Sequence, residues 1–150
     1  DGVGRVKVYP LWNGNGTVKV LIIGNDNLPC SEETVNTVIS YIEEKRPIGA
    51  TVTVDTPQLL KLTFDIKIKL DSAYSLDDTK EQISTVLSDY VNNLEDEDII
   101  YYKALSVVGD LGAVDDIVAY TINNKQENIP VGDYFIPVID TITISVSEVV

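Results

Sequence analysis

The sequence predicts an α+β fold of two small modules, a β-α-β unit followed by a ferredoxin-like α/β sandwich with a mainly antiparallel sheet. Three observations lead to this fold class. Early segments alternate strand, helix, strand, whereas later ones follow the order strand, helix, helix, strand, strand. Residues 60–70 alternate apolar and polar side chains strictly, which is typical of a half-buried strand. Asp55-Thr56-Pro57 separates the two patterns, so we expect modules at residues 1–56 and 57–150.

The first module begins with a predicted hairpin. Arg5–Tyr9 is strand-like, and Asn13-Gly14-Asn15-Gly16 is a turn signal because Asn and Gly tolerate positive φ. Thr17–Ile23 becomes apolar on both faces at its end, which predicts a central strand covered on two sides. Trp12 lies between these segments and offers either a cap over the core of this module or an interface anchor.

A helix and a second strand complete the first module. Ser31 is a suitable N-cap, and Glu32 and Glu33 follow in the first turn, where the helix dipole favours anions. Pro47 cannot continue the helix, and Gly49 turns the chain into the strand Thr51–Val54. The predicted apolar stripe of the helix consists of Val35, Val38, Ile39 and Ile42.

The second module opens with the alternating strand and a second capped helix. Ser75-Leu76-Asp77-Asp78 has the form of a capping box. The acidic run Glu95–Asp98 ends this helix beside its negative pole, which indicates either a frayed end in solvent or a functional surface. The predicted apolar side consists of Ile83, Val86, Leu87, Tyr90, Val91 and Leu94.

The rest of the module is predicted from shorter patterns. Pro130, Gly132 and Pro137 interrupt their region and favour short or edge strands there. The last strand has Ile142, Ile144 and Val146 on one face. The other predicted elements are a short strand at 99–102, a short helix from Ala104 to Leu111 closed by Gly112, a strand at 116–122 and a polar loop at 123–128.

The chain is strongly acidic. Its 150 residues carry 24 Asp and Glu against 11 Lys and Arg, a formal net charge of −13. Phosphate backbones and anionic membranes both reward clustered cations, so we expect no nucleic-acid partner and no membrane partner. The acidity serves solubility, or it docks the surface on a basic neighbour. The chain begins at Asp1 and contains no Met, which leads us to expect a fragment of a longer protein.

Standard catalytic machinery has few candidate residues here. With no His and one Cys, the sequence excludes Ser-His-Asp triads, Cys-His nucleophiles, zinc fingers and iron–sulfur clusters. No P-loop or dinucleotide-binding glycine pattern is present. Cys30 precedes a helix start that would lower its pKa, but Glu32 and Glu33 oppose this effect, so we expect an inert thiol.

Carboxylate clusters are the remaining candidates for chemistry. They occur at Asn25-Asp26-Asn27, Asp77-Asp78, Glu95–Asp98 and Asp115-Asp116, and none matches the ligand spacing of an EF-hand loop. We therefore predict no catalytic, cofactor-binding or metal-ligating residues and no enzyme. A small regulatory α+β domain that binds a ligand or divalent ion is the alternative, and a carboxylate-based hydrolase is the weakest hypothesis.

Several structural motifs resemble those of one family. They are Gly16-Thr17-Val18-Lys19-Val20, Gly24-Asn25-Asp26, Arg46-Pro47-Ile48-Gly49-Ala50, Tyr74-Ser75-Leu76-Asp77-Asp78 and Asn128-Ile129-Pro130-Val131-Gly132-Asp133. In this order they are similar to the C-terminal part of baseplate J-like proteins of contractile phage tails and phage-tail-like particles. The motifs consist of turns and caps, so they indicate a fold and no active site.

The resemblance implies a structural, non-catalytic component that assembles baseplate wedges and needs no cofactor. It implies other wedge, hub and tail-fibre attachment proteins as partners, and a homodimer in the full-length protein. It also implies a location in the bacterial cytoplasm during assembly, then in the baseplate of a virion or phage-tail-like particle.

Overall fold

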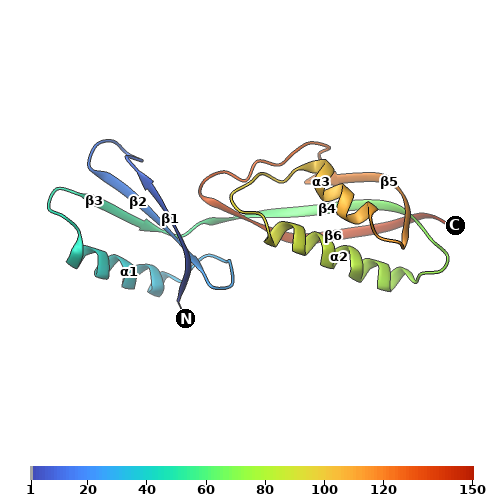
Figure 1. Ribbon diagram of the computed structural model, residues 1–150, viewed down its shortest axis with the longest axis horizontal. Helices are drawn as coiled ribbons and strands as arrows, with labels where there is room; N and C mark the ends of the chain where they lie inside the picture. Colours follow the sequence, from blue (N-terminus) through green and yellow to red (C-terminus); the bar gives the residue numbers. More distant parts are fainter. Residues whose placement is uncertain (1) are drawn as a thin grey trace. The chain divides into compact units, whose positions relative to one another are not determined.

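The computed structural model describes residues 2–150, and its contacts divide the chain into two compact units (Figure 1). Unit 1 comprises Asp1–Leu59 and Tyr134–Ile136, and unit 2 comprises Leu60–Asp133 and Pro137–Val150. The predicted α+β class is confirmed, because each unit combines helix with a three-stranded sheet. The elements are β1 (Val3–Pro10), β2 (Thr17–Gly24), α1 (Glu32–Lys45), β3 (Thr51–Asp55), β4 (Gln58–Leu70), α2 (Leu76–Asn92), α3 (Tyr101–Gly109), β5 (Val114–Ile122) and β6 (Phe135–Val149).

The sheet of unit 1 has the order β1-β2-β3, with β1 and β2 antiparallel and β2 and β3 parallel. The predicted hairpin and β-α-β unit are therefore both present. In the turn between β1 and β2, Gly14 and Gly16 take φ values of 96° and 75°, a region that glycine enters without strain. No helix in the part of the chain that the structure describes has the length and apolar character needed to cross a membrane.

β2 is the central strand and is covered on both faces, as its sequence predicted. Leu21, Ile22 and Ile23 are each no more than 1% exposed. Neighbouring residues of a strand point to opposite faces, so the burial of all three requires cover on each side. The helix α1 begins at the predicted cap, where the Thr34 N–H donates to Ser31 Oγ at 3.2 Å.

The sheet of unit 2 has the order β5-β4-β6 and is mixed, where the sequence predicted a mainly antiparallel sheet. β4 and β5 are antiparallel. β4 and β6 are parallel, because Gln58 N–H bonds to Tyr134 O near their starts and Val150 N–H bonds to Leu70 O near their ends. The reason is geometric. β5 ends beside Phe64 in the first half of β4, and the twelve residues 123–134 lead the chain to the start of β4, where β6 begins and therefore runs parallel to β4.

The core of unit 2 lies between its sheet and its two helices. The predicted register of β4 is confirmed, and the Asp78 N–H donates to the predicted N-cap, Ser75 Oγ, at 3.1 Å. The buried residues of β4 are Leu62, Phe64, Ile66, Ile68 and Leu70, and those packed on them from the helices include Ile83, Leu87, Val91, Ala104 and Val108.

The short strand predicted at 99–102 is wrong. Ile99 forms only an isolated bridge with Ile129, through two N–H···O bonds of 2.9 Å, and α3 already begins at Tyr101. The helix starts there because Asn128 Oδ1 accepts from the Tyr101 N–H at 2.9 Å, which satisfies a donor that has no partner within the helix. The last strand is longer than predicted, since β6 runs through Pro137 as an edge strand.

Candidate functional site

The acidic clusters noted in the sequence lie at helix starts, in turns and on one strand. Asp77 and Asp78 occupy the first turn of α2, and Asp116 on β5 lies opposite Lys69 on β4. Asp26 Oδ1 accepts a backbone N–H two residues further on, at 3.0 Å. Among residues 2–150, no three Asp, Glu, His or Cys side chains come close enough to hold a metal ion. Asp26 therefore orders the backbone of its own turn.

Cys30 lies half-buried before α1. Its N–H donates to Thr56 Oγ1 at 2.7 Å, and Thr56 Oγ1 in turn donates to Ile22 O at 2.9 Å. Burial raises the pKa of the thiol, a hydrogen bond with Thr56 opposes this, and the negative charge of Asp26 raises the pKa further. The thiol is therefore favoured over the reactive thiolate at neutral pH.

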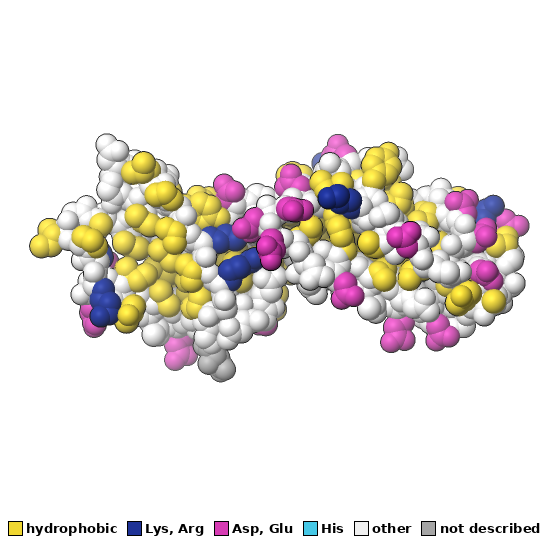
Figure 2. Space-filling view, in the orientation of Figure 1, with side chains coloured by type: hydrophobic (Ala, Val, Ile, Leu, Met, Phe, Trp, Pro, Cys, Tyr) yellow, Lys and Arg dark blue, Asp and Glu magenta, His cyan; other side chains and the backbone are white. Residues whose placement is uncertain are grey.

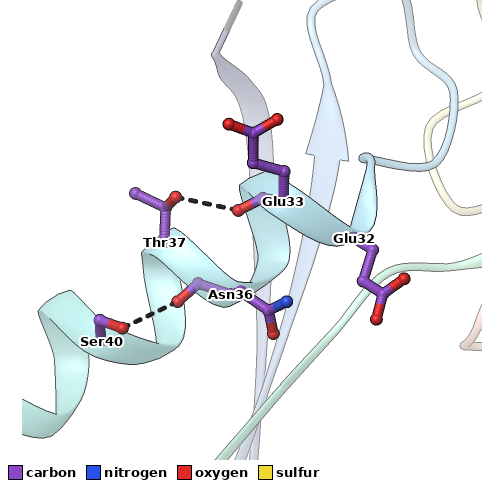
Figure 3. Close-up of a pocket in the computed structure, with 5 residues that line it drawn as sticks. All are labelled: Glu32, Glu33, Asn36, Thr37 and Ser40. Carbon is purple, nitrogen blue, oxygen red and sulfur yellow. Dashed lines mark hydrogen bonds between the residues drawn. The ribbon is translucent and has the colours of Figure 1, made fainter.

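The depression shown in Figure 3 lies on one exposed side of α1, and all five lining residues come from this helix. Its volume is about 480 Å³. Thr37 Oγ1 donates to Glu33 O at 2.9 Å and Ser40 Oγ donates to Asn36 O at 3.1 Å, so both hydroxyls are engaged by their own helix. A shallow surface of one helix does not surround a substrate with converging groups.

Unit 2 contains a buried aromatic cluster. The Tyr101 and Tyr120 rings lie 4.6 Å apart between centroids, and Phe64 stacks on Tyr120 at 6.4 Å. The Tyr101 hydroxyl donates to Tyr120 O at 2.6 Å, whereas the Tyr120 hydroxyl is buried without a hydrogen-bond partner among the described residues. Burial is the main cause that raises the pKa of both phenols, so both remain neutral. This cluster is part of the core.

Unit 1 carries an aromatic cluster around one cation. Lys19 Nζ lies 5.0 Å from the centre of the Trp12 ring and 4.4 Å from that of Tyr134, and 3.3 Å from Asp55 Oδ2. Tyr9 meets Tyr134 edge to face, with centroids 5.1 Å apart. Trp12 is thus partly a cover over Lys19, although 40% of it stays exposed. No local sequence pattern signals this cluster, because Tyr134 lies far along the chain from Lys19.

Exposed apolar side chains concentrate on unit 1. Of the sixteen large hydrophobic residues that are exposed in the described chain, eleven belong to this unit of 62 residues and five to the 88 residues of unit 2. Figure 2 shows hydrophobic side chains gathered over the unit that contains β1–β3 and α1. The eleven are Val6, Val8, Leu11, Trp12, Leu28, Ile39, Tyr41, Ile48, Leu59, Tyr134 and Phe135. Unit 1 therefore offers more apolar surface for a protein–protein contact than unit 2 does.

Comparison with protein families gives two matches in chain order. Residues 1–56 match the baseplate J-like central domain, and residues 62–145 match the baseplate J-like protein C-terminal domain. The junction between the two matches lies close to Asp55-Thr56-Pro57, where the sequence patterns change.

Individual proteins give related results. The chain is 30% identical over 146 residues to phage-like element PBSX protein XkdT of Bacillus subtilis (strain 168), covering 91% of this chain and 42% of XkdT. It is also 30% identical over 153 residues to protein YqbT of the same organism, covering 96% and 44%. The chain thus spans less than half the length of these curated relatives.

The fold also occurs in a solved structure. A chain of the six-fold symmetrised cryo-EM structure of the anti-feeding prophage baseplate superposes with a TM-score of 0.68 at 11% sequence identity. The superposition covers 92% of this chain and 34% of the other. At this identity the likeness shows a shared fold.

Proposed function

The chain belongs to the baseplate J-like protein family, and we propose that it helps to assemble the wedges of a contractile phage or phage-like tail baseplate. It is a structural component and not an enzyme, in keeping with this family. The observation that supports the wedge role best is the consecutive match of both domain models, which together take in nearly the whole chain.

The distribution of surface and core supports an assembly role. Unit 2 has a core whose residues are almost fully excluded from solvent. Unit 1 presents most of the exposed apolar side chains. We propose residues 1–56 and 57–150 as its two building modules, one offering contact surface and the other mechanical support.

The proposed partners are other wedge proteins, hub proteins and tail-fibre attachment proteins, and the full-length protein is proposed to form a homodimer. Nucleic acid and membrane are not proposed as partners, since the net charge of −13 repels both. The proposed location is the bacterial cytoplasm during assembly and the baseplate of the finished particle.

A deletion and complementation experiment tests the wedge role. The gene for the full-length protein is deleted from a host that produces the particle, and the lysate is imaged by negative-stain electron microscopy. We expect tails without baseplates or no contractile particles, and recovery when the full-length gene is supplied in trans.

A second supplied gene provides the control. It carries the exposed substitution Val118→Thr, which leaves the core of unit 2 intact and should restore particles like the wild type. Complete, contractile particles in the deletion strain would overturn the proposed role. A saturable thermal stabilisation of the purified chain by a divalent cation would instead support the ion-binding alternative.

A further inference from the structure

The outer edge of β1 carries backbone groups that the sheet leaves open. The Leu11 N–H bonds to Thr17 O at 2.8 Å, which fixes the alternation of the ladder between β1 and β2. By that alternation, the N–H and C=O groups of Val6 and Val8 point away from β2. Within residues 2–150, neither valine makes a backbone hydrogen bond on that side. An edge of this kind can accept another strand.

The same two valines form an apolar ledge. Val6 lies opposite Ile22 and Val8 opposite Val20, so all four side chains lie on one face of the sheet. Ile22 is 1% exposed, whereas Val6 and Val8 are 51% and 59% exposed. The difference arises because α1 packs against β3, at the far side of the sheet from β1.

The other face of β1 is basic. Arg5 and Lys7 alternate with the valines, and no acidic residue lies on this strand, although the whole chain has a net charge of −13. Arg5 is partly buried: its Nη2 donates to Asn27 Oδ1 at 3.3 Å, whereas its Nε has no hydrogen-bond partner among the described residues. One face of the open edge therefore favours apolar side chains, and the opposite face favours acidic ones.

The open edge of β1 can pair with another strand over only a short stretch, because both of its ends are interrupted. A bulge at Gly4 shifts the register at the start of β1, and Pro10 has no N–H to offer at the end. An added strand can pair with only about five residues between these points, which sets its register. Pairing of two copies of β1 would bring their Arg and Lys side chains together, which disfavours a second copy as the occupant.

The edge strands of unit 2 lack this combination. β5 has two register shifts against β4 and carries Asp115 and Asp116, and both features protect an edge from strand addition. β6 carries Glu148 and no basic residue. The open, apolar and basic edge is therefore a property of β1.

We propose that the outer edge of β1 binds an extended segment of a partner protein in which apolar and acidic residues alternate. The segment adds as a fourth strand, bonds to the backbone of Val6 and Val8, covers their side chains and places its carboxylates beside Arg5 and Lys7. This proposal does not rest on the wedge role, because the binding is a property of the isolated chain.

Two synthetic peptides test the proposal. The first is a blocked seven-residue peptide with alternating valine and glutamate, and the second has lysine in place of glutamate. Each is titrated into the ¹⁵N-labelled chain at about 0.15 M salt, where charges beyond roughly 8 Å are screened. We expect the glutamate peptide to bind at least about tenfold more tightly and to slow amide exchange at Val6 and Val8.

Two variants of Val8 separate the backbone from the side-chain contribution. Val8→Pro removes an outward N–H and no bond of the β1–β2 ladder, so we expect at least about a tenfold loss of binding with little loss of stability. Val8→Thr removes one of the two valines of the apolar ledge and weakens binding less, whereas Val118→Thr on β5 is the matched control and leaves binding unchanged.

Three results would overturn the proposal. They are equal affinity for the two peptides, unchanged binding by Val8→Pro, and exchange protection confined to residues outside β1. A free chain that sediments as a dimer, and loses the dimer in Val8→Pro, would assign the edge to a second copy instead. Thermal unfolding of each variant shows whether its sheet is intact.

Discussion

The two units of the chain use the same architecture, helix on a three-stranded sheet, but differ in how completely the helix is buried. In unit 2, Ile83 and Leu87 of α2 and Ala104 and Val108 of α3 are fully buried. In unit 1, no residue of α1 is fully buried. A helix gains most of its stability from packing of its apolar face, so α1 is held less firmly than α2.

Charge separates the units as well. Unit 1 carries seven acidic and five basic side chains, a net charge of −2, whereas unit 2 carries seventeen acidic and six basic ones, a net charge of −11. Unit 2 therefore combines a dense core with a strongly acidic surface. Unit 1 combines a thinner core with exposed apolar side chains and little charge. The comparison indicates that stability lies mainly in unit 2 and contact surface mainly in unit 1.

The largest expected loss of stability comes from truncating a large buried side chain in the core of unit 2. Phe64→Ala removes a ring that is fully buried between β4 and the helices, and we expect a loss of about 3–5 kcal/mol in the free energy of unfolding. Ile39→Ala on α1 is the counterpart in unit 1, where the side chain is 37% exposed, and should cost about 1 kcal/mol. Urea unfolding followed by tryptophan fluorescence and far-UV circular dichroism measures both, and equal losses would contradict the comparison.

The next largest loss of stability is expected from replacing a glycine by alanine, and each unit offers one glycine for this test. A Cβ added at Gly4 would lie 2.7 Å from Asn25 Cα and 2.8 Å from Gly24 O, which are backbone atoms that cannot move aside cheaply. We expect Gly4→Ala to cost about 1–3 kcal/mol. Gly109→Ala is the control, because a Cβ there meets only the end of the Ile117 side chain at 3.7 Å. Thermal unfolding should leave this control unchanged or slightly more stable.

Removal of the two helix N-caps should show the same difference between α1 and α2. Ser31→Ala and Ser75→Ala each remove one cap hydrogen bond, and each should cost about 1 kcal/mol. The two variants should differ in which part of the chain opens more readily. Amide hydrogen exchange should show faster local opening confined to α1 in the first variant, and faster exchange throughout unit 2 in the second. Exchange that spreads equally in both variants would mean that α1 is as firmly held as α2.

Local signals predicted most of these elements. Both N-caps, the glycine turn at residues 13–16 and the register of β4 follow from residue chemistry and periodicity within short windows. The sequence-based predictions failed where residues distant in the sequence determine the local structure. Asn128 fixes the start of α3, and Tyr134 completes the cluster around Lys19. No local pattern encodes such contacts, and the same holds for the open edge of β1, whose exposure depends on the position of α1.

The smallest expected effects concern the two buried phenols of unit 2. Tyr101→Phe removes the 2.6 Å hydrogen bond to Tyr120 O and should cost about 1 kcal/mol. Tyr120→Phe removes a buried hydroxyl that has no partner among the described residues, so it should be neutral or slightly stabilising. Denaturant midpoints measured at pH 7 distinguish the two variants.

The raised pKa values of the same two phenols predict that unit 2 loses folding stability at alkaline pH. Burial raises the pKa of Tyr101 and Tyr120 in the folded state above the unfolded value of 10.0, so folding favours the protonated form. Their contribution to stability is fully present below pH 10 and falls as the pH rises above it. Among the described residues of unit 1 no tyrosine is buried, so the amides of this unit should keep their relative protection when unit 2 begins to open. Tyr120→Phe should move that opening to higher pH, and an unchanged alkaline midpoint would show that these phenols do not set the limit.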